Sequence, residues 1–297
     1  MKFKIGFDVG GTEIKAGIID GDFNIISKTT TAFPKGADYR HTVKLMQKTA
    51  TRMIEEKFQG GDAPDAIGIA VAGTINPSKD AVIKAVNLGF YNVPMKREME
   101  LYYPGVPIGL INDADAAALA EHTKGALKGY NSALLITIGT GMGSGLILNG
   151  GLYGGGLGHG VEAGHVTLAL GKEPCHCGNY GCIETLCAAS WFTKKTGSNA
   201  KTIIDAAKQG ETKSLEIFEE YIENLSSAIA SLTALLDPEI IAIGGGVSLA
   251  GDFLFNPLRE KVRQKSFFKY PYNIVPAKLG NDAGMIGAAI SVQMTPA

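Results

Sequence analysis

The sequence contains few of the features that indicate a secreted, membrane or nucleic-acid-binding protein. Four of its 297 residues are cysteines, and three of these fall between positions 175 and 182. Such clustering argues against a disulfide framework and favours the reducing cytoplasm. The 28 lysines and arginines nearly balance the 29 aspartates and glutamates. A net charge of −1 therefore predicts neither a nucleic-acid partner nor an anionic membrane surface.

Long hydrophobic runs are also missing. A membrane-spanning helix needs about 18 or more consecutive apolar residues, and serines and threonine interrupt the best candidate, residues 225–236. The charges at Lys2 and Lys4 come too early for a signal peptide, so we expect no secretory leader. A hydrophobic content of 45% with 19% charged residues is typical of a globular protein. A chain of 297 residues favours two domains.

Glycine is abundant, with 39 residues, and it gathers in clusters after apolar strands. Gly10, Gly11 and Thr12 separate two expected strands, and Gly139, Thr140 and Gly141 begin a similar turn between two others. The two segments match at corresponding positions, which indicates an internal duplication. A third cluster, Gly244, Gly245 and Gly246, follows another apolar run. The strands so predicted are residues 3–9, 14–19, 134–138, 146–148 and 240–243.

Helical periodicity separates these strands, which predicts an α/β fold. We expect a first domain over residues 1–118 and a larger second domain over 119–283. The C-terminal helix, about residues 284–297, is expected to return to the first domain. The helices predicted are residues 39–58, 114–124, 214–236 and 283–292.

The glycine clusters are suited to binding phosphate. Without Cβ atoms a turn can bring successive backbone N–H groups close to anionic oxygens. One hairpin alone would be interpreted as an ordinary tight turn, but two related hairpins and a third cluster favour a nucleotide. The chain has no Gly-x-x-x-x-Gly-Lys-Ser/Thr motif, which excludes a P-loop enzyme. Asp8 ends the first strand, where a carboxylate can hold Mg²⁺ through water.

An apolar strand ends at Asn112-Asp113, and an alanine-rich helix follows directly. Asp113 has two compatible interpretations. It could be the N-cap of the helix, which would stabilise the helix by about 1 kcal/mol. Together with the glycine hairpins, the pattern favours a general base that accepts a proton as a substrate hydroxyl attacks a phosphate. Asn112 offers both a donor and an acceptor to a polyhydroxylated substrate.

The chain also carries a Cys-x-Cys-Gly-x-x-Gly-Cys knuckle, with a histidine ten residues upstream of its first cysteine. Three thiolates and an imidazole form the ligand set of a closed structural zinc site. The ligands predicted are His165, Cys175, Cys177 and Cys182. The fourth cysteine, Cys187, is expected to be a buried small hydrophobic residue.

Taken together, these motifs resemble the ROK family of sugar kinases and repressors. The resemblance runs along almost the whole chain and includes Asp8-Val-Gly-Gly-Thr12, Asn112-Asp113-Ala-Asp115, Glu162-Ala-Gly-His165, the knuckle and Gly244-Gly-Gly-Val247. It implies an actin-like ATPase fold, with two ribonuclease-H-like α/β domains and a cleft between them that closes over ATP and a sugar. Among ROK kinases the motifs look most like those of bacterial glucokinases.

The resemblance also implies site residues, with Asp113 as the catalytic base and the knuckle as the zinc site. The implied substrate-binding residues are Gly73, Asn87, Asn112, Asp113, Glu162, His165 and Glu184. The implied ATP- and Mg²⁺-binding residues are Asp8, Gly10, Gly11, Thr12, Lys15, Gly139, Thr140, Gly141, Gly244, Gly245 and Gly246. The expected partners are ATP and a hexose, and a homodimer is implied.

Three positions depart from the family pattern: Glu13 replaces a common lysine, Asp115 an asparagine, and Val161 a glycine. The predicted activity is ATP-dependent phosphorylation of glucose to glucose 6-phosphate. Kinases for N-acetylmannosamine, β-glucosides, allose or fructose share almost every motif, so these sugars remain alternatives. A sugar-sensing repressor is a more remote alternative. Such proteins carry a winged helix before the first hairpin, and here the first strand starts at Phe3.

Overall fold

The computed structural model describes residues 2–58, 62–171 and 173–292. The chain divides into two compact units. The first comprises Met1–Ala120, Gly154–Gly160 and Asn281–Ala297, and the second comprises Glu121–Tyr153 and Val161–Gly280. The end of the helix expected at 284–297 lies outside the described residues, which stop at 292.

The first unit is built on a five-stranded sheet with the order β3-β2-β1-β4-β8. β1 pairs antiparallel with β2 and parallel with β4, which pairs parallel with β8. β1 and β4 are buried almost throughout, as expected for central strands covered on both faces, whereas the edge strand β3 alternates toward solvent. The bounds are β1 Phe3–Val9, β2 Glu13–Asp20, β3 Ile25–Ala32, β4 Ala66–Val71 and β8 Ile108–Asn112.

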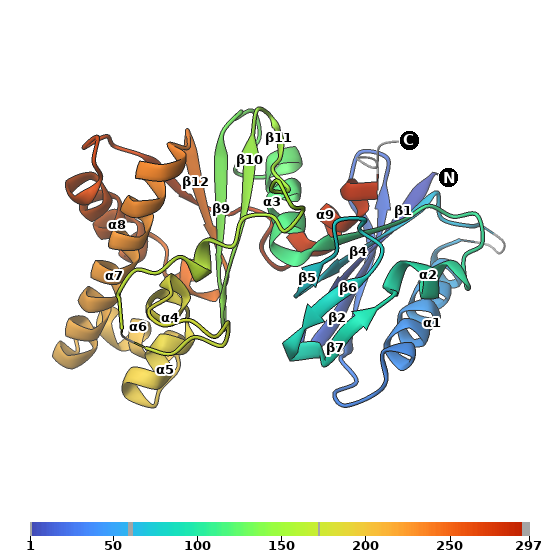
Figure 1. Cartoon of the computed structure of the whole chain (residues 1–297), viewed down its shortest axis with the longest axis horizontal. Helices are drawn as coiled ribbons and strands as arrows, with labels where there is room; N and C mark the ends of the chain where they lie inside the picture. The colour runs from blue at the N-terminus through green and yellow to red at the C-terminus, as the bar shows by residue number, and fades with distance from the viewer. Residues whose placement is uncertain (1, 59–61, 172, 293–297) are drawn as a thin grey trace. The chain divides into compact units, whose positions relative to one another are not determined.

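Helices cover this sheet, as Figure 1 shows. α9 (Ala283–Ser291) contacts β1 and β4, while α1 (Tyr39–Lys57) contacts β2 and β3. α1 begins where the Asp38 side chain accepts the Arg40 N–H at 2.8 Å. α3 (Asp113–Lys124) follows β8 directly and continues into the second unit. A smaller sheet has the order β5-β6-β7. The remaining elements are β5 Thr74–Ile75, β6 Val82–Ala85, the 3₁₀ helix η1 Val86–Leu88, β7 Phe90–Val93 and α2 Met95–Glu100.

The second unit repeats the arrangement, with the order β11-β10-β9-β12-β13. β9 and β10 form an antiparallel hairpin, and β9, β12 and β13 are parallel neighbours. In both large sheets, successive strands on one side of the central strand pair antiparallel, and successive strands on the other side pair parallel. A duplication predicts this likeness. The bounds are β9 Ala133–Ile138, β10 Met142–Leu148, β11 Gly151–Leu152, β12 Ile240–Gly244 and β13 Asn273–Pro276.

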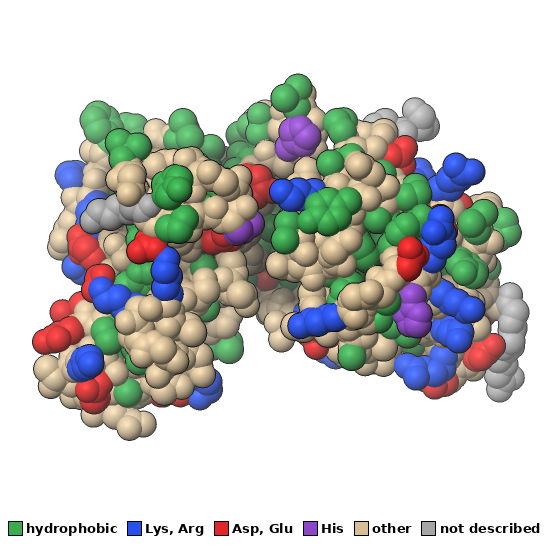
Figure 2. All heavy atoms as spheres, turned by 60° about the horizontal axis from the view of Figure 1, so that its bottom comes forward, with side chains coloured by type: hydrophobic (Ala, Val, Ile, Leu, Met, Phe, Trp, Pro, Cys, Tyr) green, Lys and Arg blue, Asp and Glu red, His purple; other side chains and the backbone are tan. Residues whose placement is uncertain are grey.

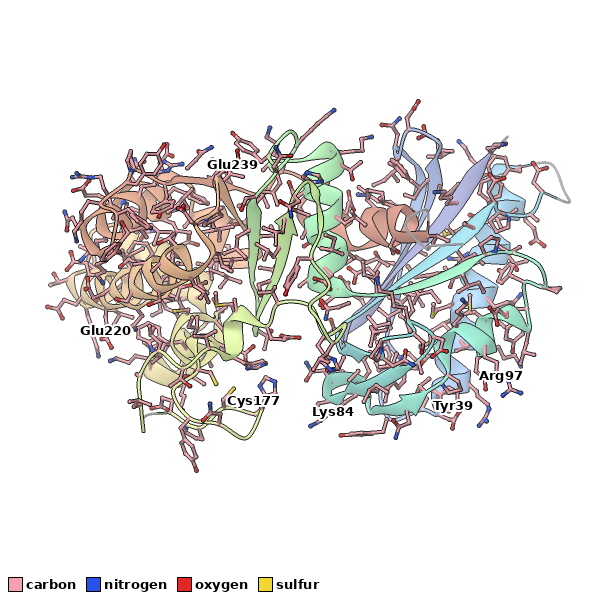
Figure 3. The ribbon with its side chains drawn as sticks, turned by 45° about the horizontal axis from the view of Figure 1, so that its top comes forward. Tyr39, Lys84, Arg97, Cys177, Glu220 and Glu239 are labelled. Carbon is pink, nitrogen blue, oxygen red and sulfur yellow. The ribbon has the colours of Figure 1, made fainter. Side chains whose placement is uncertain are left out.

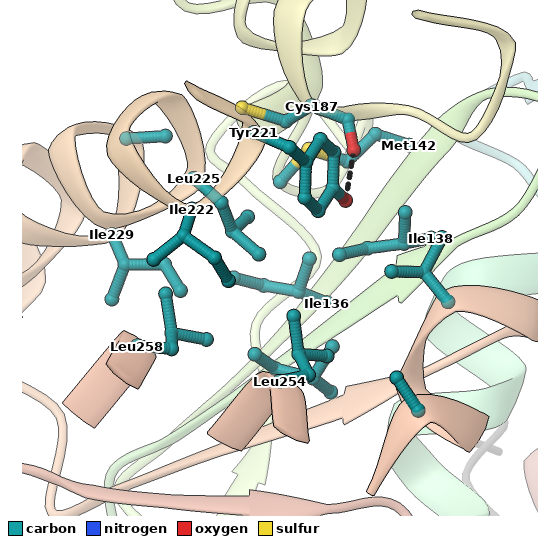
Figure 4. Packing of buried hydrophobic residues seen from close by; sticks show 14 of the residues in the cluster. Ile136, Ile138, Met142, Cys187, Tyr221, Ile222, Leu225, Ile229, Leu254 and Leu258 are labelled. Carbon is teal, nitrogen blue, oxygen red and sulfur yellow. Dashed lines mark hydrogen bonds between the residues drawn. The ribbon is translucent and has the colours of Figure 1, made fainter. Parts of the chain in front are cut away.

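The core of the second unit lies between its sheet and a group of helices (Figure 4). Tyr221 is completely buried there, and its hydroxyl donates to the Cys187 carbonyl at 2.7 Å. Cys187 is a buried core residue, as the sequence predicted. The remaining elements are η2 Ala163–His165, α4 Ile183–Cys187, α5 Ser190–Thr196, α6 Ala200–Lys208, α7 Thr212–Leu236, η3 Gly246–Ala250, α8 Asp252–Lys265 and η4 Gly280–Asp282.

The surface carries charges of both signs. On the face shown in Figure 2, basic and acidic side chains are interspersed, in keeping with the net charge of −1. Within the described part of the chain, no helix combines the length and the apolar character needed to cross a membrane.

Candidate functional site

In the first unit, predicted site residues lie where the three parallel strands end. Val9 pairs with Val71 and Val71 with Asn112, so the carboxyl ends of β1, β4 and β8 are level. In α/β sheets of this kind, ligands bind at this edge. Gly10, Gly73 and Asp113 follow these ends directly or within two residues.

Asp8 is largely buried near the end of β1. Its Oδ2 accepts from Lys15 Nζ at 3.3 Å, because Asp8 and Lys15 are register partners in the β1–β2 hairpin. Burial raises the pKa of Asp8, and the nearby Lys15 charge opposes that rise. Lys15 Nζ also lies 3.5 Å from Glu13 Oε1. A carboxylate held in this way suits Mg²⁺ bound through water.

Asn112 fixes the start of α3. Its Oδ1 accepts the backbone N–H groups of Ala114 at 2.8 Å and Asp115 at 3.1 Å, while its Nδ2 donates to the Gly73 carbonyl at 3.1 Å. The side chain that caps the helix is therefore Asn112, and the interpretation of Asp113 as the N-cap is wrong. Asp113 is the first helical residue, where the helix N-terminus stabilises a carboxylate. The structure thus brings Gly73, Asn112 and Asp113 together.

Asn87 lies against the first glycine hairpin. A Cβ placed on Gly11 would be 3.1 Å from the Asn87 Cβ and 3.3 Å from its carbonyl oxygen. Asn87 is exposed and belongs to the 3₁₀ helix η1. The first unit therefore holds one predicted sugar-binding residue beside its predicted phosphate hairpin.

In the second unit the other two glycine clusters also meet at one sheet edge. Gly139 N–H donates to the Gly141 carbonyl at 3.0 Å, which closes the turn between β9 and β10. Gly244 pairs with Thr137 of β9, and a Cβ on Gly245 would lie only 2.2 Å from the Ile138 carbonyl oxygen. The turn and the Gly244–Gly246 segment thus leave the sheet side by side. Glycine turns at such an edge can bring backbone amides close to the oxygens of a phosphate-containing ligand.

Ser144 anchors the loop that carries Glu162 and His165. Its hydroxyl donates to the Val161 carbonyl at 2.5 Å and accepts the Ala163 N–H at 3.0 Å. These two bonds hold the backbone on both sides of Glu162. Sequence analysis missed Ser144, because a lone serine in a strand after a glycine turn carries no distinctive signal.

The four predicted metal ligands come together in this unit. One donor atom from each of His165, Cys175, Cys177 and Cys182 lies within 4.8 Å of all the others. The Cys177 and Cys182 sulfurs are 3.7 Å apart, and Cys175 Sγ is 3.6 Å from His165 Nδ1. Zinc–sulfur bonds of about 2.3 Å in a tetrahedron place sulfurs about 3.7 Å apart. The donor set and its spacing therefore fit zinc.

The thiols of the knuckle differ in acidity. Burial raises the pKa of Cys175 and raises that of Cys182 to about 12. A backbone hydrogen bond from Asn179 lowers the pKa of Cys177, whose side chain lies in an exposed part of the loop (Figure 3). Burial disfavours the thiolate form, and three thiolates close together repel one another. A cation would therefore be needed to stabilise three thiolates here.

Glu184 connects the knuckle with the glycine turn. Its Oε2 accepts the Met142 N–H at 2.9 Å, and its Oε1 lies 3.1 Å from His176 Nδ1. A Cβ on Gly141 would approach Glu184 Oε2 to 2.6 Å, so only glycine fits there without moving the carboxylate. His176 is a second residue that sequence analysis missed, although it lies between two predicted ligands.

Comparison with known proteins identifies the family. The family model described as "ROK family" matches residues 4–295. The glucokinase of Thermotoga maritima is 34% identical, over 96% of this chain and 95% of its own length. A crystal structure of a ROK hexokinase from Thermus thermophilus has a TM-score of 0.85 at 31% identity and 98% coverage of both chains.

A second solved structure is similar over its whole length. It is a ROK family glucokinase from Streptomyces griseus in complex with glucose and AMPPNP, with a TM-score of 0.81 and 30% identity, over 99% of this chain and 100% of that one. These likenesses confirm the actin-like fold that the motifs predicted. The glycine turns, the Asn112-Asp113 strand end and the Cys₃His set each lie in the order that the resemblance requires, and the chain belongs to the ROK family.

Proposed function

We propose that the protein is an ATP-dependent hexose kinase that phosphorylates glucose on its 6-hydroxyl. One observation carries the chemical part of the proposal: Asp113 is the first residue of α3, and Asn112 already caps that helix. Asp113 thus lies both at the carboxyl end of β8 and in the first turn of α3, where a carboxylate is stabilised and ligands bind in sheets of this kind. The glucokinases at 30% identity or more support glucose as the substrate.

In the proposed reaction Asp113 accepts the proton of the sugar hydroxyl. The hydroxyl oxygen then forms a bond to the γ-phosphorus, the bond from that phosphorus to the β-phosphate oxygen breaks, and ADP leaves. The turns at Gly10–Thr12 and Gly139–Gly141 lie against the phosphates, and Gly244–Gly246 contacts the adenosine. Asp8, with Lys15 nearby, would hold Mg²⁺ through water, and the ion would supply positive charge against the phosphates.

The family resemblance supports sugar binding by the backbone of Gly73 and the side chains of Asn87 and Asn112 in the first unit. In the second unit it supports sugar binding by the side chains of Glu162, His165 and Glu184. Glu162 and His165 would face the C1 and C2 side of the ring. Zinc on His165, Cys175, Cys177 and Cys182 would fix the loop that carries the polar groups, since a ligating imidazole is oriented by its metal.

Family resemblance further supports a homodimer, and free thiols in a metal set support a cytoplasmic location. Light scattering of the purified protein tests the dimer. A single molecular mass equal to that of one chain would contradict it.

The kinase proposal is tested with Asp113→Asn, a nearly isosteric change that removes the proton acceptor. We expect turnover to fall about 10²-fold or more while sugar binding is largely kept. A variant whose turnover is within a few-fold of wild type would mean that Asp113 has no catalytic role.

The identity of the sugar is tested by measuring kcat/KM across a panel of hexoses with coupled detection of ADP. A preference of more than about tenfold for N-acetylmannosamine, a β-glucoside, allose or fructose would refute the assignment of glucose.

The zinc proposal is tested by elemental analysis and by two cysteine variants. We expect about one zinc per chain. Cys177→Ser should lower both zinc content and sugar affinity, whereas the matched control Cys187→Ser should change neither. Metal-free protein with full activity would contradict the bracing role of zinc and leave the kinase assignment intact.

A further inference from the structure

The Glu184 carboxylate has a specific contact on each side. Oε2 is bound by the Met142 N–H at 2.9 Å, at the end of the glycine turn that closes β9 and β10. Oε1 is 3.1 Å from His176 Nδ1. The Glu184 side chain is only 13% exposed, and Cys175 Sγ also lies 3.9 Å from its Oε1, so protein atoms and not bulk water surround most of the carboxylate.

His176 approaches Glu184 from the exposed side. Its ring is 63% exposed and meets the His165 ring edge to face, with 5.3 Å between centroids. Cys175 and Cys177 flank His176 in the sequence and both belong to the metal set. Once both thiolates are fixed, the His176 backbone between them is fixed as well. The knuckle therefore places the His176 imidazole in contact with the Glu184 carboxylate.

We propose that His176 is a positioning residue, which holds Glu184 so that one oxygen keeps the Met142 amide and the carboxylate presents a defined edge to the sugar. The inference rests on the proposed function, because it concerns the same sugar-binding carboxylate. Long carboxylate side chains lose rotamer entropy when they are ordered. A contact already fixed by the metal loop removes much of that ordering from the sugar-binding step.

Two other roles for His176 make different demands. As a zinc ligand it would have to join the three cysteines, but the donor atoms within 4.8 Å of one another in that set come from His165 and the cysteines. His165, His176 and Glu184 form a second group of donors at the same spacing, which could bind a further metal ion. Both roles predict that zinc content depends on His176, whereas the positioning role predicts that it does not.

The experiment compares zinc-loaded wild type with His176→Ala and His176→Asn. The asparagine amide nitrogen occupies the place of Nδ1, so this variant keeps a polar nitrogen beside Glu184 without the ring. His41→Ala, on the exposed face of α1, is the matched control. Three quantities are measured for each protein: zinc per chain, the dissociation constant of glucose by calorimetry, and the hydrogen-exchange rate of the Met142 amide without sugar.

We expect the loss of the imidazole contact in His176→Ala to weaken glucose binding about tenfold and to accelerate Met142 exchange, with zinc unchanged. His176→Asn should recover most of both effects, and His41→Ala should match wild type. Unchanged Met142 exchange in His176→Ala, failure of His176→Asn to rescue, or a zinc content that falls with His176 would each overturn the proposal. A wild-type protein that neither binds nor phosphorylates glucose would refute the assigned sugar, while the exchange rate would still decide the role of His176.

Discussion

Glu121 offers the sharpest test of how the backbone near the unit boundaries is held. This carboxylate is completely buried. Its Oε2 accepts the Ala126 N–H at 2.6 Å, and its Oε1 accepts the N–H groups of Lys278 at 2.8 Å and Leu279 at 2.6 Å. Glu121 follows the first boundary between the units directly, and residues 278–279 shortly precede the last one, at 280/281.

Glu121→Gln keeps the shape of the side chain but replaces one acceptor oxygen with an NH₂ group. Even if the amide oxygen takes the place of Oε1, the Ala126 N–H is left facing a donor. A buried polar group without its partner costs about 1–3 kcal/mol. Neutralising the carboxylate also removes part of its desolvation penalty, which places the expected loss in the lower half of that range. For a unit of this size, each kcal/mol lowers Tm by about 2–4 °C.

Differential scanning calorimetry should therefore show a Tm lower by several degrees for Glu121→Gln. Glu121→Ala should lose more, because three donors are left without an acceptor and a cavity forms. Glu216→Gln is the matched control, since Glu216 is exposed on α7. A Tm of Glu121→Gln equal to that of wild type would show that the three short contacts do not stabilise the fold.

Three further predictions follow from packing and acidity. Gly68→Ala should destabilise the first unit by about 1–3 kcal/mol in urea unfolding, because the added Cβ would lie 1.8 Å from the Ala288 carbonyl oxygen of α9; a variant as stable as wild type would contradict this packing. Because burial raises the folded-state pKa of Asp8, ionising it opposes folding, so Asp8→Asn should be more stable than wild type at pH 7. That advantage should shrink as the pH falls through the folded pKa, and an advantage that grows toward acid would refute the argument. In zinc-free protein, iodoacetamide should modify Cys177 first and Cys187 last by mass spectrometry, because Cys177 is exposed with a lowered pKa whereas burial raises that of Cys187; the reverse order would exclude this explanation.

Much of the fold could be predicted because its strands and long helices carry strong periodic signals. The expected strand at 3–9 matches β1, and the helix expected at 214–236 matches α7, which begins two residues earlier. The strand expected at 146–148 in fact begins at Met142, since its first residues include glycines that β-propensity disfavours. Among the helices of the described residues, α2, α4, α5, α6 and α8 were missed. Several are only five to nine residues long, and α8 contains Pro257, which hides its periodicity.

The site could be predicted only as far as its residues form local motifs. The knuckle is compact in sequence, and its four ligands converge in the structure. The residues that hold the site residues in place come from distant positions or have no distinctive local motif. A single sequence does not show which of these residues contact one another. Ser144 reaches the loop around Glu162 from a strand, and Asn112 takes the capping role expected of Asp113 because its side chain reaches two amides of the first turn.

The contacts that position the proposed base and those that position the proposed sugar-binding residues of the knuckle lie in different units. Asp113 and Asn112 depend on a strand end and a helix start within the first unit, and no metal ligand lies near them in sequence. Glu184 and His165 depend on the knuckle of the second unit. If zinc orders only the latter pair, its removal should weaken sugar binding while the proton acceptor keeps its geometry. Loss of the metal should then act mainly on KM, and loss of the Asp113 carboxylate mainly on kcat. Steady-state kinetics can therefore distinguish the positioning role of zinc from the proton-acceptor role of Asp113.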